Sequence, residues 1–397
     1  MLRFVGKRLY EPLYTSELNF TSTGISKFPT FRVLSPSGET SSGFKNPFSE
    51  SEAKRMFDTM ISVSAFDSIL YDVQRQGRIS FYMQNSGEEA LQVGSAAALE
   101  SVDVVWPQYR ELGVFLWRGF TGQMVTDQCM SVKAEVGKGR QMPVHYCFPQ
   151  GNIQAVTSPI ATQLTQAAGM GYAFRLDGEG KVSVAYFGEG ASSEGDFSVA
   201  LNFAAVKQSQ TLFLCRNNGY AISTPANEQF ATDGVAPRGP GFGVLTARVD
   251  GNDVFAVFEA VKKAREISVS DKRPVLLELM TYRKGHHSTS DDASRYRPAG
   301  ELEKHQPEDG ISRFASYLIK NKIINADYEF EIRTLKKSEI LEALKNSEGK
   351  KKGSIKDMFT DVYSEMPWHL QEQYHQIKSH VEKHKDKYNL DKYESDQ

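Results

Sequence analysis

The sequence has few cysteines and no long apolar segment, and each absence narrows what the protein can be. Three cysteines occur in 397 residues, at Cys129, Cys147 and Cys215, and none of them forms a Cys-x-x-Cys pair. We therefore expect free thiols in a reducing compartment and no disulfide framework. No apolar run approaches the roughly 20 residues that a membrane-spanning helix needs, so we expect no membrane insertion.

An excess of charge of either sign is also missing. The chain has 47 basic and 49 acidic residues and a formal net charge of −2. Such a balance does not indicate contact with nucleic acid or with an anionic membrane surface, so we expect no nucleic-acid partner. Low-complexity tracts and internal repeats are absent, and the length alone favours about two to three domains.

Residues 1–50 are expected to form an N-terminal arm. Residues 11–50 are rich in Ser, Thr and Pro, which favours an extended segment over a compact unit. Before Glu11 the chain carries basic residues, including Arg3 and Arg8, and no acidic one. This pattern fits a short mitochondrial targeting segment and fits an unstructured start equally well.

Residues 51–300 alternate between strand and helix patterns, and the clearest unit spans residues 181–220. An apolar run at 182–187 predicts a buried strand, glycines turn the chain, and a helix with an apolar face follows before a second strand at 212–215. Strand, helix and strand in this order form a right-handed crossover of a parallel sheet. Further strands are predicted at 102–106, 244–249 and 275–282, and further helices at 50–77, 161–175 and 254–267. We therefore expect a doubly wound, mostly parallel α/β domain.

Polar residues follow the predicted strands at their carboxyl ends. Gly188, Glu189 and Gly190 follow the first strand of the clearest unit, and Arg216 and Asn218 follow the second. Ligands of parallel sheets bind at this edge. A carboxylate and an amide supply the hard oxygen ligands that Mg²⁺ prefers, while glycine N–H groups and an arginine suit an anion. The pattern predicts a site for a magnesium-bound diphosphate.

Three other segments are expected to join this edge. Tyr109 and Arg110 follow another predicted strand, where a second arginine would help to hold a phosphate. Residues 138–163 form a polar loop interrupted by proline, and a long loop in a compact domain is usually functional. After the last strand, His286 and His287 favour acid-base chemistry or anion contact over metal binding.

Two helical patterns concern packing. Ser86 and Glu89 have the spacing of a capping box and predict a short helix that begins there. The helix at 161–175 carries small residues, among them Gly169 and Gly171, that allow a second backbone to approach closely. This close approach fits packing on the sheet and also fits a contact between subunits.

Residues 301–397 change in character, because they are charged, helical in pattern and poor in strand formers. The run of glycines and lysines at 349–353 predicts an exposed hinge. The region is either a helical appendage or an arm that wraps around a partner, and the sequence favours neither.

Several segments together resemble one family. They are RQGRISFYMQN, GEEALQVGSAAAL, PQYRE, KGRQMPVHY, TSPIATQ, YFGEGASSEGD, CRNNGYAISTP, VDGNDVFAV and TYRKGHHSTSDDASRYR. Through them the chain is similar, from about residue 28 to 390, to alpha subunits of the branched-chain 2-oxo acid dehydrogenase decarboxylating component, which use thiamine diphosphate. Pyruvate-specific alpha subunits usually have Asp in place of Glu189 and a single histidine in place of His286 and His287. The resemblance therefore favours the branched-chain type over the pyruvate type.

The resemblance implies a role for each of several site residues. Glu189, Asn218 and the Tyr220 carbonyl would hold magnesium. Cofactor contacts would come from Gln108, Tyr109, Arg110, Ser158, Ile160, Gly188, Gly190, Arg216 and His287. A potassium ion that orders the cofactor loop would be bound by Thr157, Pro159, Thr162 and Gln163. His287 would also be the catalytic proton donor when the acyl group is transferred.

The resemblance also implies a reaction, partners and a location. The enzyme would oxidatively decarboxylate branched-chain 2-oxo acids in valine, leucine and isoleucine catabolism, and pass the acyl group to the lipoyl group of an acyltransferase component. A beta subunit would complete each site in a two-alpha, two-beta heterotetramer, because no motif here supplies the carboxylate that activates the cofactor ring. Ser288 matches a regulatory phosphorylation site, on which a dedicated kinase and phosphatase would act, whereas the second such site falls at Pro298. The location would be the mitochondrial matrix, or the cytoplasm of a bacterium.

Two other classes of protein are disfavoured. A nicotinamide-dependent dehydrogenase would need a Gly-x-Gly-x-x-Gly turn, which the residues after Gly190 do not supply. A non-catalytic scaffold with the same fold is disfavoured because Glu189, Asn218, Arg110 and His287 are all present.

Overall fold

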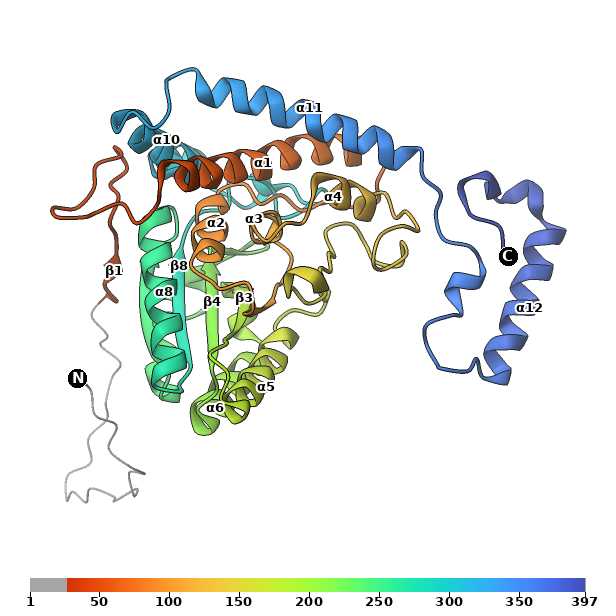
Figure 1. The fold of residues 1–397 in the computed structure, drawn as a ribbon, viewed down its shortest axis with the longest axis horizontal. Coiled ribbons are helices and arrows are strands. Elements are labelled where there is room, and N and C mark those ends of the chain that lie inside the picture. The colour runs from red at the N-terminus through yellow and green to blue at the C-terminus, as the bar shows by residue number, and fades with distance from the viewer. Residues whose placement is uncertain (1–26, 397) are drawn as a thin grey trace.

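The structure is a computed structural model, and it describes residues 27–396 (Figure 1). The expected targeting segment and the first half of the N-terminal arm lie outside the described residues. The three cysteines are free, as expected, and Cys129 and Cys215 are buried. Within residues 27–396, none of the helices combines the length and the apolar character that crossing a membrane requires.

The centre of the molecule is a sheet of six strands that all run parallel. Their order across the sheet is β1 (Thr30–Phe31), β7 (Leu245–Asp250), β8 (Val275–Met280), β4 (Thr211–Asn217), β3 (Ser183–Gly188) and β2 (Val104–Trp106). The strands expected from the sequence are confirmed to within a few residues. The sheet has one strand more than the sequence predicts, because β1 comes from the segment expected to be an arm.

A buried aspartate explains why this part of the arm joins the sheet. One oxygen of Asp253 accepts hydrogen bonds from the backbone N–H groups of Val33 and Leu34 at 2.6 and 2.5 Å. The other oxygen accepts from Phe255 and Ala256, which caps the first turn of α8 (Val254–Ser270). One carboxylate therefore starts a helix and fixes the chain that leads out of β1.

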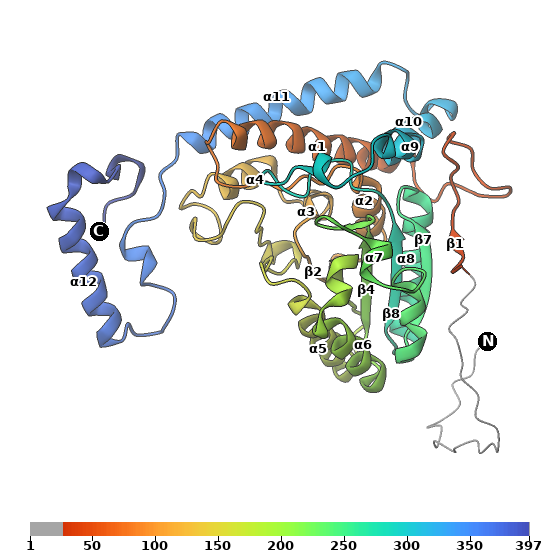
Figure 2. The same ribbon diagram turned by 180° about the vertical axis from the view of Figure 1, so that it is seen from behind.

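Helices cover both faces of the sheet, which confirms the doubly wound fold (Figures 1 and 2). On one face lie α5 (Thr162–Asp177) and α6 (Gly195–Lys207), and on the other lie α2 (Glu89–Ala97) and α8. Strand side chains alternate between the faces: in β3, Val184 and Tyr186 join one core cluster, whereas Ala185 and Phe187 join the other.

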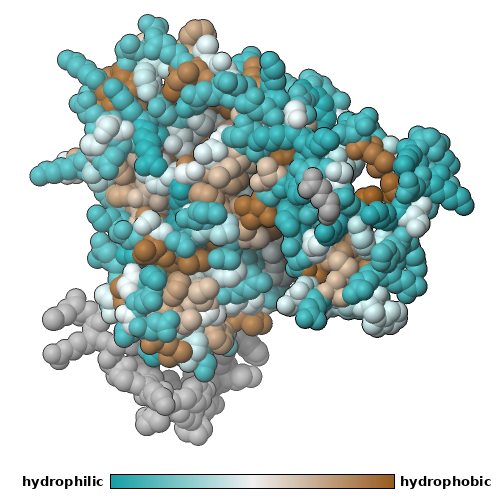
Figure 3. Space-filling model, turned by 45° about the vertical axis from the view of Figure 1, so that its right-hand side comes forward, coloured by the Kyte–Doolittle hydropathy of each residue, from teal (hydrophilic) through white to brown (hydrophobic). Residues whose placement is uncertain are grey.

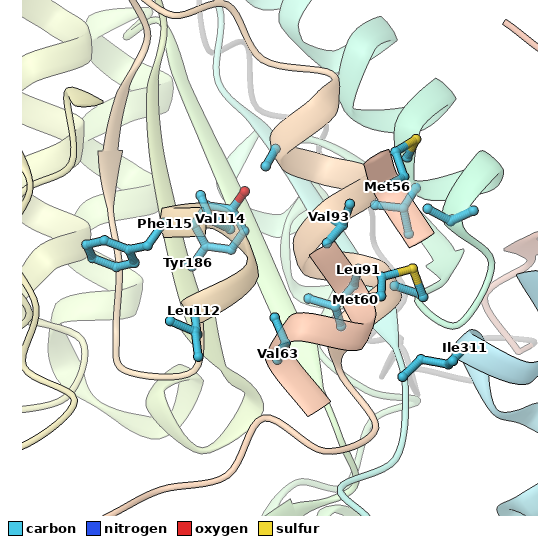
Figure 4. Close-up of a cluster of buried hydrophobic side chains, with 14 of the residues drawn as sticks. Met56, Met60, Val63, Leu91, Val93, Leu112, Val114, Phe115, Tyr186 and Ile311 are labelled. Atoms are coloured by element: carbon cyan, nitrogen blue, oxygen red, sulfur yellow. The ribbon is translucent and has the colours of Figure 1, made fainter. Parts of the chain in front are cut away.

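The larger core cluster lies between the sheet and an outer layer of helices. Figure 4 shows side chains of α1 (Glu50–Arg75), α2 and α3 (Leu112–Trp117) meeting Tyr186 of β3 and Ile311 of α10 (Gly310–Lys320). Along the outside, α11 (Tyr328–Glu348) packs against α1 and against α4 (Gly122–Cys129), as both ribbon views show. The first half of the C-terminal region is therefore part of the main core.

Helix starts differ from the prediction at one place. α1 begins with a capping box in which Ser49 Oγ accepts from Glu52 N at 3.3 Å and the Glu52 carboxylate accepts from Ser49 N at 2.9 Å. The capping box predicted at Ser86 and Glu89 is wrong, because α2 begins at Glu89 and its N-cap is Glu88. Glu89 instead accepts from Gly87 N at 2.9 Å, and the Glu88 side chain is used elsewhere.

The second half of the C-terminal region extends away from the core (Figure 1). Its helix, α12 (Trp368–Lys383), buries no residue, and this part of the surface is mostly hydrophilic with a few exposed apolar side chains (Figure 3). The expected hinge at 349–353 is tied to α4 and to the chain that follows it. Lys350 Nζ lies 2.7 Å from a carboxylate oxygen of Asp127, and Lys133 N donates to Lys351 O at 3.0 Å.

Candidate functional site

The carboxyl ends of β2, β3, β4 and β8 border a cavity of about 460 Å³. This is the edge of a parallel sheet at which ligands bind. Residues that the sequence singled out line the cavity, and they are Gln108, Tyr109, Arg110, Ser158, Ile160, Gly188, Glu189, Gly190, Arg216, Asn218, Tyr220 and His287. Residues that were not singled out line it too, and they include Phe81, Met83, Met142, His145, Glu194 and Arg283.

Glu189 follows β3 directly and is 1% exposed. Its Oε2 lies 3.4 Å from the backbone nitrogen of Asn218, and its Oε1 has no hydrogen-bond partner within residues 27–396. Burial, with the negative charge of Glu88, raises the pKa of Glu189 to about 7. A buried carboxylate oxygen without a donor is costly unless a cation or a donor meets it. Gly190 is required beside it, because a Cβ at this position would lie 2.9 Å from Ala221 Cβ.

Asn218 and Arg216, at the end of β4, are held by buried acids that the sequence did not single out. Asn218 Nδ2 donates to Glu88 Oε1 at 2.6 Å, and Arg216 Nη1 donates to Glu88 Oε2 at 2.6 Å. Arg216 Nε lies 2.6 Å from Glu111 Oε1. Burial alone would lower the pKa of Arg216, but Glu111 and Glu88 raise it above its ordinary value. Arg216 is therefore a permanent cation paired with two carboxylates.

Two further arginines meet at His287. Arg110 Nη2 donates to the His287 carbonyl at 2.6 Å and lies 3.2 Å from Nδ1 of the ring. Arg283 Nη1 lies 3.4 Å from the same Nδ1 and 3.3 Å from the Tyr220 carbonyl oxygen. Burial, together with Arg110 and Arg283, lowers the pKa of His287 to about 3. The imidazole is thus neutral beside two guanidinium groups, which is an arrangement that suits an anion.

Arg283 was recognisable from the sequence by the same signal that singled out Arg110 and Arg216. Each of the three arginines lies at the carboxyl end of a strand or just beyond it. Glu111 directly follows Arg110 and lies beyond β2 in the same way. Glu88 carried no such signal, because it precedes α2 instead of following a strand, and acids are common before a helix.

A second group of oxygens lies at the start of α5. Thr157 Oγ1 and Thr162 Oγ1 are 3.2 Å apart, and Thr162 Oγ1 donates to the Pro159 carbonyl at 3.1 Å. Gln163 Nε2 donates to Tyr186 O at 2.9 Å, and Gln163 Oε1 is buried without a hydrogen-bond partner among the residues that the structure describes. Hydroxyl, carbonyl and amide oxygens are hard ligands. Ser158, in the same loop, lies with its Oγ 2.9 Å from His145 Nε2.

The segment after β8 folds back on itself around Asp291. The Asp291 carboxylate accepts from His287 N at 2.7 Å and from Tyr296 OH at 2.6 Å. Ala293 N donates to His286 Nδ1 at 2.9 Å. Ser288 is half-buried, next to His287 in the chain. This loop therefore fixes the backbone of His287 through Asp291.

Comparison with known proteins identifies a family to which the sequence is similar. The family model described as the dehydrogenase E1 component matches residues 57–356. The chain belongs to the dehydrogenase E1 component family. This family is the thiamine diphosphate-dependent decarboxylating component of 2-oxo acid dehydrogenases.

Relatives within the E1 component family match nearly the whole chain. The mitochondrial 2-oxoisovalerate dehydrogenase subunit alpha of Dictyostelium discoideum is 47% identical over 92% of this chain and 83% of its own length. Subunit alpha 1 of Arabidopsis thaliana is 46% identical over 93% of this chain and 79% of its own length. The human subunit alpha is 44% identical over 93% of this chain and 84% of its own length. These likenesses agree with the family resemblance drawn from the motifs.

The residues of the cavity fit the cofactor of the E1 component family. A diphosphate with a divalent cation needs oxygen ligands for the cation and fixed positive charge for the phosphates. Glu189 offers an unpartnered buried oxygen beside Asn218, and Arg110 and Arg283 offer guanidinium groups at the cavity wall. The donor set therefore matches the chemistry of the group.

Glu89, the first residue of α2, gives the stability of the fold a pH dependence that unfolding experiments can measure. Burial raises the pKa of Glu89 from 4.5 to about 8, and Lys284 offsets part of the rise. The folded state thus binds the proton of Glu89 more tightly than the unfolded state does. The stabilisation from this bound proton is complete below about pH 4 and is lost as the pH rises through about 8. In Glu89→Gln, the free energy of unfolding should fall less between pH 5.5 and 8 than in the wild type, as measured by urea unfolding. Glu342→Gln, at an exposed position of α11, is the matched control, and an unchanged pH profile in Glu89→Gln would contradict the assignment.

Proposed function

We propose that this chain is the alpha subunit of a branched-chain 2-oxo acid dehydrogenase. The enzyme oxidatively decarboxylates branched-chain 2-oxo acids and passes the acyl group to the lipoyl group of an acyltransferase component. The observation that carries the proposal is the unpartnered oxygen of Glu189 beside Asn218, in a cavity that also holds Arg110, Arg283 and His287. The names of the relatives support the choice of branched-chain substrates.

The site residues expected from the sequence have the following roles in this proposal. Glu189, Asn218 and the Tyr220 carbonyl hold Mg²⁺, while Tyr109, Arg110, Arg216 and His287 contact the diphosphate. Gln108, Gly188, Gly190, Ser158 and Ile160 line the pocket for cofactor and substrate. Thr157, Pro159, Thr162 and Gln163 hold K⁺, which fixes the loop before α5. Gln163 Oε1, buried and without a partner, supports the K⁺ site.

Thiamine diphosphate, when bound, supplies the group that attacks the 2-oxo carbon and accepts the electron pair released with carbon dioxide. Arg110 and Arg283 bind and orient the charged end of the cofactor. His287 is neutral while both guanidinium groups lie unneutralised beside it, because its pKa is lowered to about 3. An anion between these groups offsets their charge and raises the pKa of His287, so that His287 can take up a proton and donate it during acyl transfer.

The proposal includes a partner for the cavity. Arginines lie at the sheet edge, and in this proposal they hold the cofactor there together with Mg²⁺. The carboxylate that activates the cofactor ring comes from a beta subunit. Two alpha and two beta subunits form the assembly, which works with a lipoyl-bearing acyltransferase. Because the relatives are named as mitochondrial proteins, we assign the enzyme to the mitochondrial matrix.

We further propose a division of the chain into an arm at 1–50, a cofactor-binding α/β domain at 51–300 and a helical region at 301–397. The run of strands between β2 and β8 supports the middle unit. The helices α10, α11 and α12 support the third region.

The subunit requirement is tested by assaying the chain with and without the beta subunit. Alone, the chain should release no carbon dioxide from 3-methyl-2-oxobutanoate. With the beta subunit, kcat/KM for 3-methyl-2-oxobutanoate should exceed that for pyruvate by about tenfold or more, because an apolar pocket discriminates by the methyl groups that it buries. Robust decarboxylation by the chain alone, or a preference for pyruvate, would refute this part of the proposal.

Phosphorylation of Ser288 by a dedicated kinase, reversed by a phosphatase, would control this enzyme. A phosphate adds about −1.5 to −2 charge, and Ser288 directly follows His287, whose backbone N–H is bound to Asp291. Negative charge there repels Asp291 and competes for Arg110 and Arg283. The loop would then release His287 and block the lipoyl group.

A charge substitution tests this control without the kinase. Ser288→Glu in the complete complex should lower decarboxylation and acyl transfer by about tenfold or more, which corresponds to roughly 1.4 kcal/mol. Ser294→Glu is the matched control, because Ser294 lies in the same loop but is exposed and bonds only to the nearby Asp292. Equal activities of the two variants would argue against a role for position 288.

A further inference from the structure

Glu88 occupies an unusual place for a carboxylate. It is 0% exposed, it precedes α2 rather than following a strand, and its two oxygens accept from two different residues. Oε1 accepts from Asn218 Nδ2 and Oε2 accepts from Arg216 Nη1, both at 2.6 Å. Glu88 therefore connects the loop before α2 to the two polar residues at the end of β4.

The hydrogen bond from Asn218 to Glu88 determines which end of the Asn218 amide is free to bind another group. An ionised carboxylate only accepts hydrogen bonds, and the amide nitrogen of asparagine only donates them. With Nδ2 held by Glu88, the oxygen Oδ1 faces away from Glu88, and it lies 3.3 Å from Tyr220 N. A divalent cation needs the oxygen and cannot bind the NH₂ group.

Arg216 holds Glu88 in the place that this orientation requires. Arg216 is a permanent cation, and Glu111 holds it from the other side with Oε1 at 2.6 Å from Nε. Glu111 touches Arg216 but makes no contact with Asn218 among its hydrogen bonds and ion pairs in residues 27–396.

We propose that Glu88 is a positioning residue that fixes the amide of Asn218 so that Oδ1 is presented to the divalent cation. This inference rests on the proposed function, since it places the cation between Glu189 and Asn218. It assigns to Glu88 a task beyond the neutralisation of Arg216, which Glu111 shares.

The exchange of donor and acceptor between positions 88 and 218 tests the proposal. In Glu88→Gln, the new amide turns its oxygen to Arg216 and its NH₂ to Asn218, so Asn218 must turn its own oxygen toward position 88 and present NH₂ to the cation. Mg²⁺ affinity should fall about 10- to 100-fold, the range found for residues that orient metal ligands. In E88Q/N218D the aspartate accepts from the new NH₂ with one oxygen and keeps the other for the cation. Mg²⁺ affinity should then recover at least about tenfold relative to E88Q.

The measurement is calorimetric titration of Mg²⁺ into the assembled complex of alpha and beta subunits with thiamine diphosphate present. Glu111→Gln is the matched control, because it removes a carboxylate from Arg216 and leaves the hydrogen bond between Glu88 and Asn218. The Mg²⁺ affinity of this variant should change by less than about threefold, well below the loss expected for E88Q. The proposal would be overturned if E88Q bound Mg²⁺ normally or if E88Q/N218D showed no recovery. It would also be overturned if E111Q lost as much Mg²⁺ affinity as E88Q.

Assembly and the proposed function are checked separately. If E88Q does not assemble with the beta subunit, E88Q/N218D is compared with Asn218→Asp, in which two carboxylates face each other. The double variant should bind Mg²⁺ about tenfold or more tightly than Asn218→Asp, and equal affinities, or failure of the double variant to assemble, would overturn the inference. A wild-type complex that binds neither Mg²⁺ nor thiamine diphosphate would contradict the proposed function itself, whereas wild-type binding with an unaffected E88Q contradicts only the role of Glu88.

Discussion

The buried guanidinium group of Arg216 is the interaction on which the rest of the site depends. Glu88 and Glu111 each lie 2.6 Å from it, and all three side chains are 1% exposed or less. Removal of Arg216 would leave two buried carboxylates without their cation and would be strongly destabilising. The pairings join the loop before α2, the segment after β2 and the end of β4. Three parts of the chain that are far apart in sequence are thereby held at one edge of the sheet.

Two groups at this edge of the sheet have pKa values that are shifted in opposite directions. Burial and Glu88 raise the pKa of Glu189 to about 7, and burial with two arginines lowers the pKa of His287 to about 3. Both shifts favour the neutral form, as expected where a carboxylate has no cation and an imidazole faces two cations. A magnesium-bound diphosphate would supply a cation to Glu189 and an anion to His287. The electrostatics of this edge are therefore complementary to the cofactor of the E1 component family.

The sequence predicted the residues of the site better than the bonds among them. Strand ends are visible in a sequence, and in a parallel sheet they all meet at one edge, so Arg110, Glu189 and Asn218 could be grouped correctly in one cavity. The partners of these residues could not be predicted in the same way. Glu88 was overlooked because its neighbour Glu89 has the spacing of a capping residue, whereas the structure gives Glu89 a bond to Gly87 and turns Glu88 toward the strand ends.

The N-terminal arm shows the same limit in the fold. Its composition indicates an extended chain, and the segment at Thr30–Phe31 is indeed extended, but composition does not show that β7 has a free edge beside it. The partner that decides the outcome is Asp253, more than two hundred residues away in the sequence. Elements defined by local periodicity were therefore predictable, and those fixed by distant polar groups were not.

The central claim is that oxygens of Glu189 and Asn218 share a divalent cation at the diphosphate. It is tested most directly by crystals of the complex of alpha and beta subunits grown with thiamine diphosphate and Mn²⁺, with data collected for anomalous scattering from manganese. The account predicts an anomalous peak within coordination distance of a Glu189 carboxylate oxygen and of Asn218 Oδ1. A peak away from both residues, or bound thiamine diphosphate with no peak at this edge of the sheet, would contradict it.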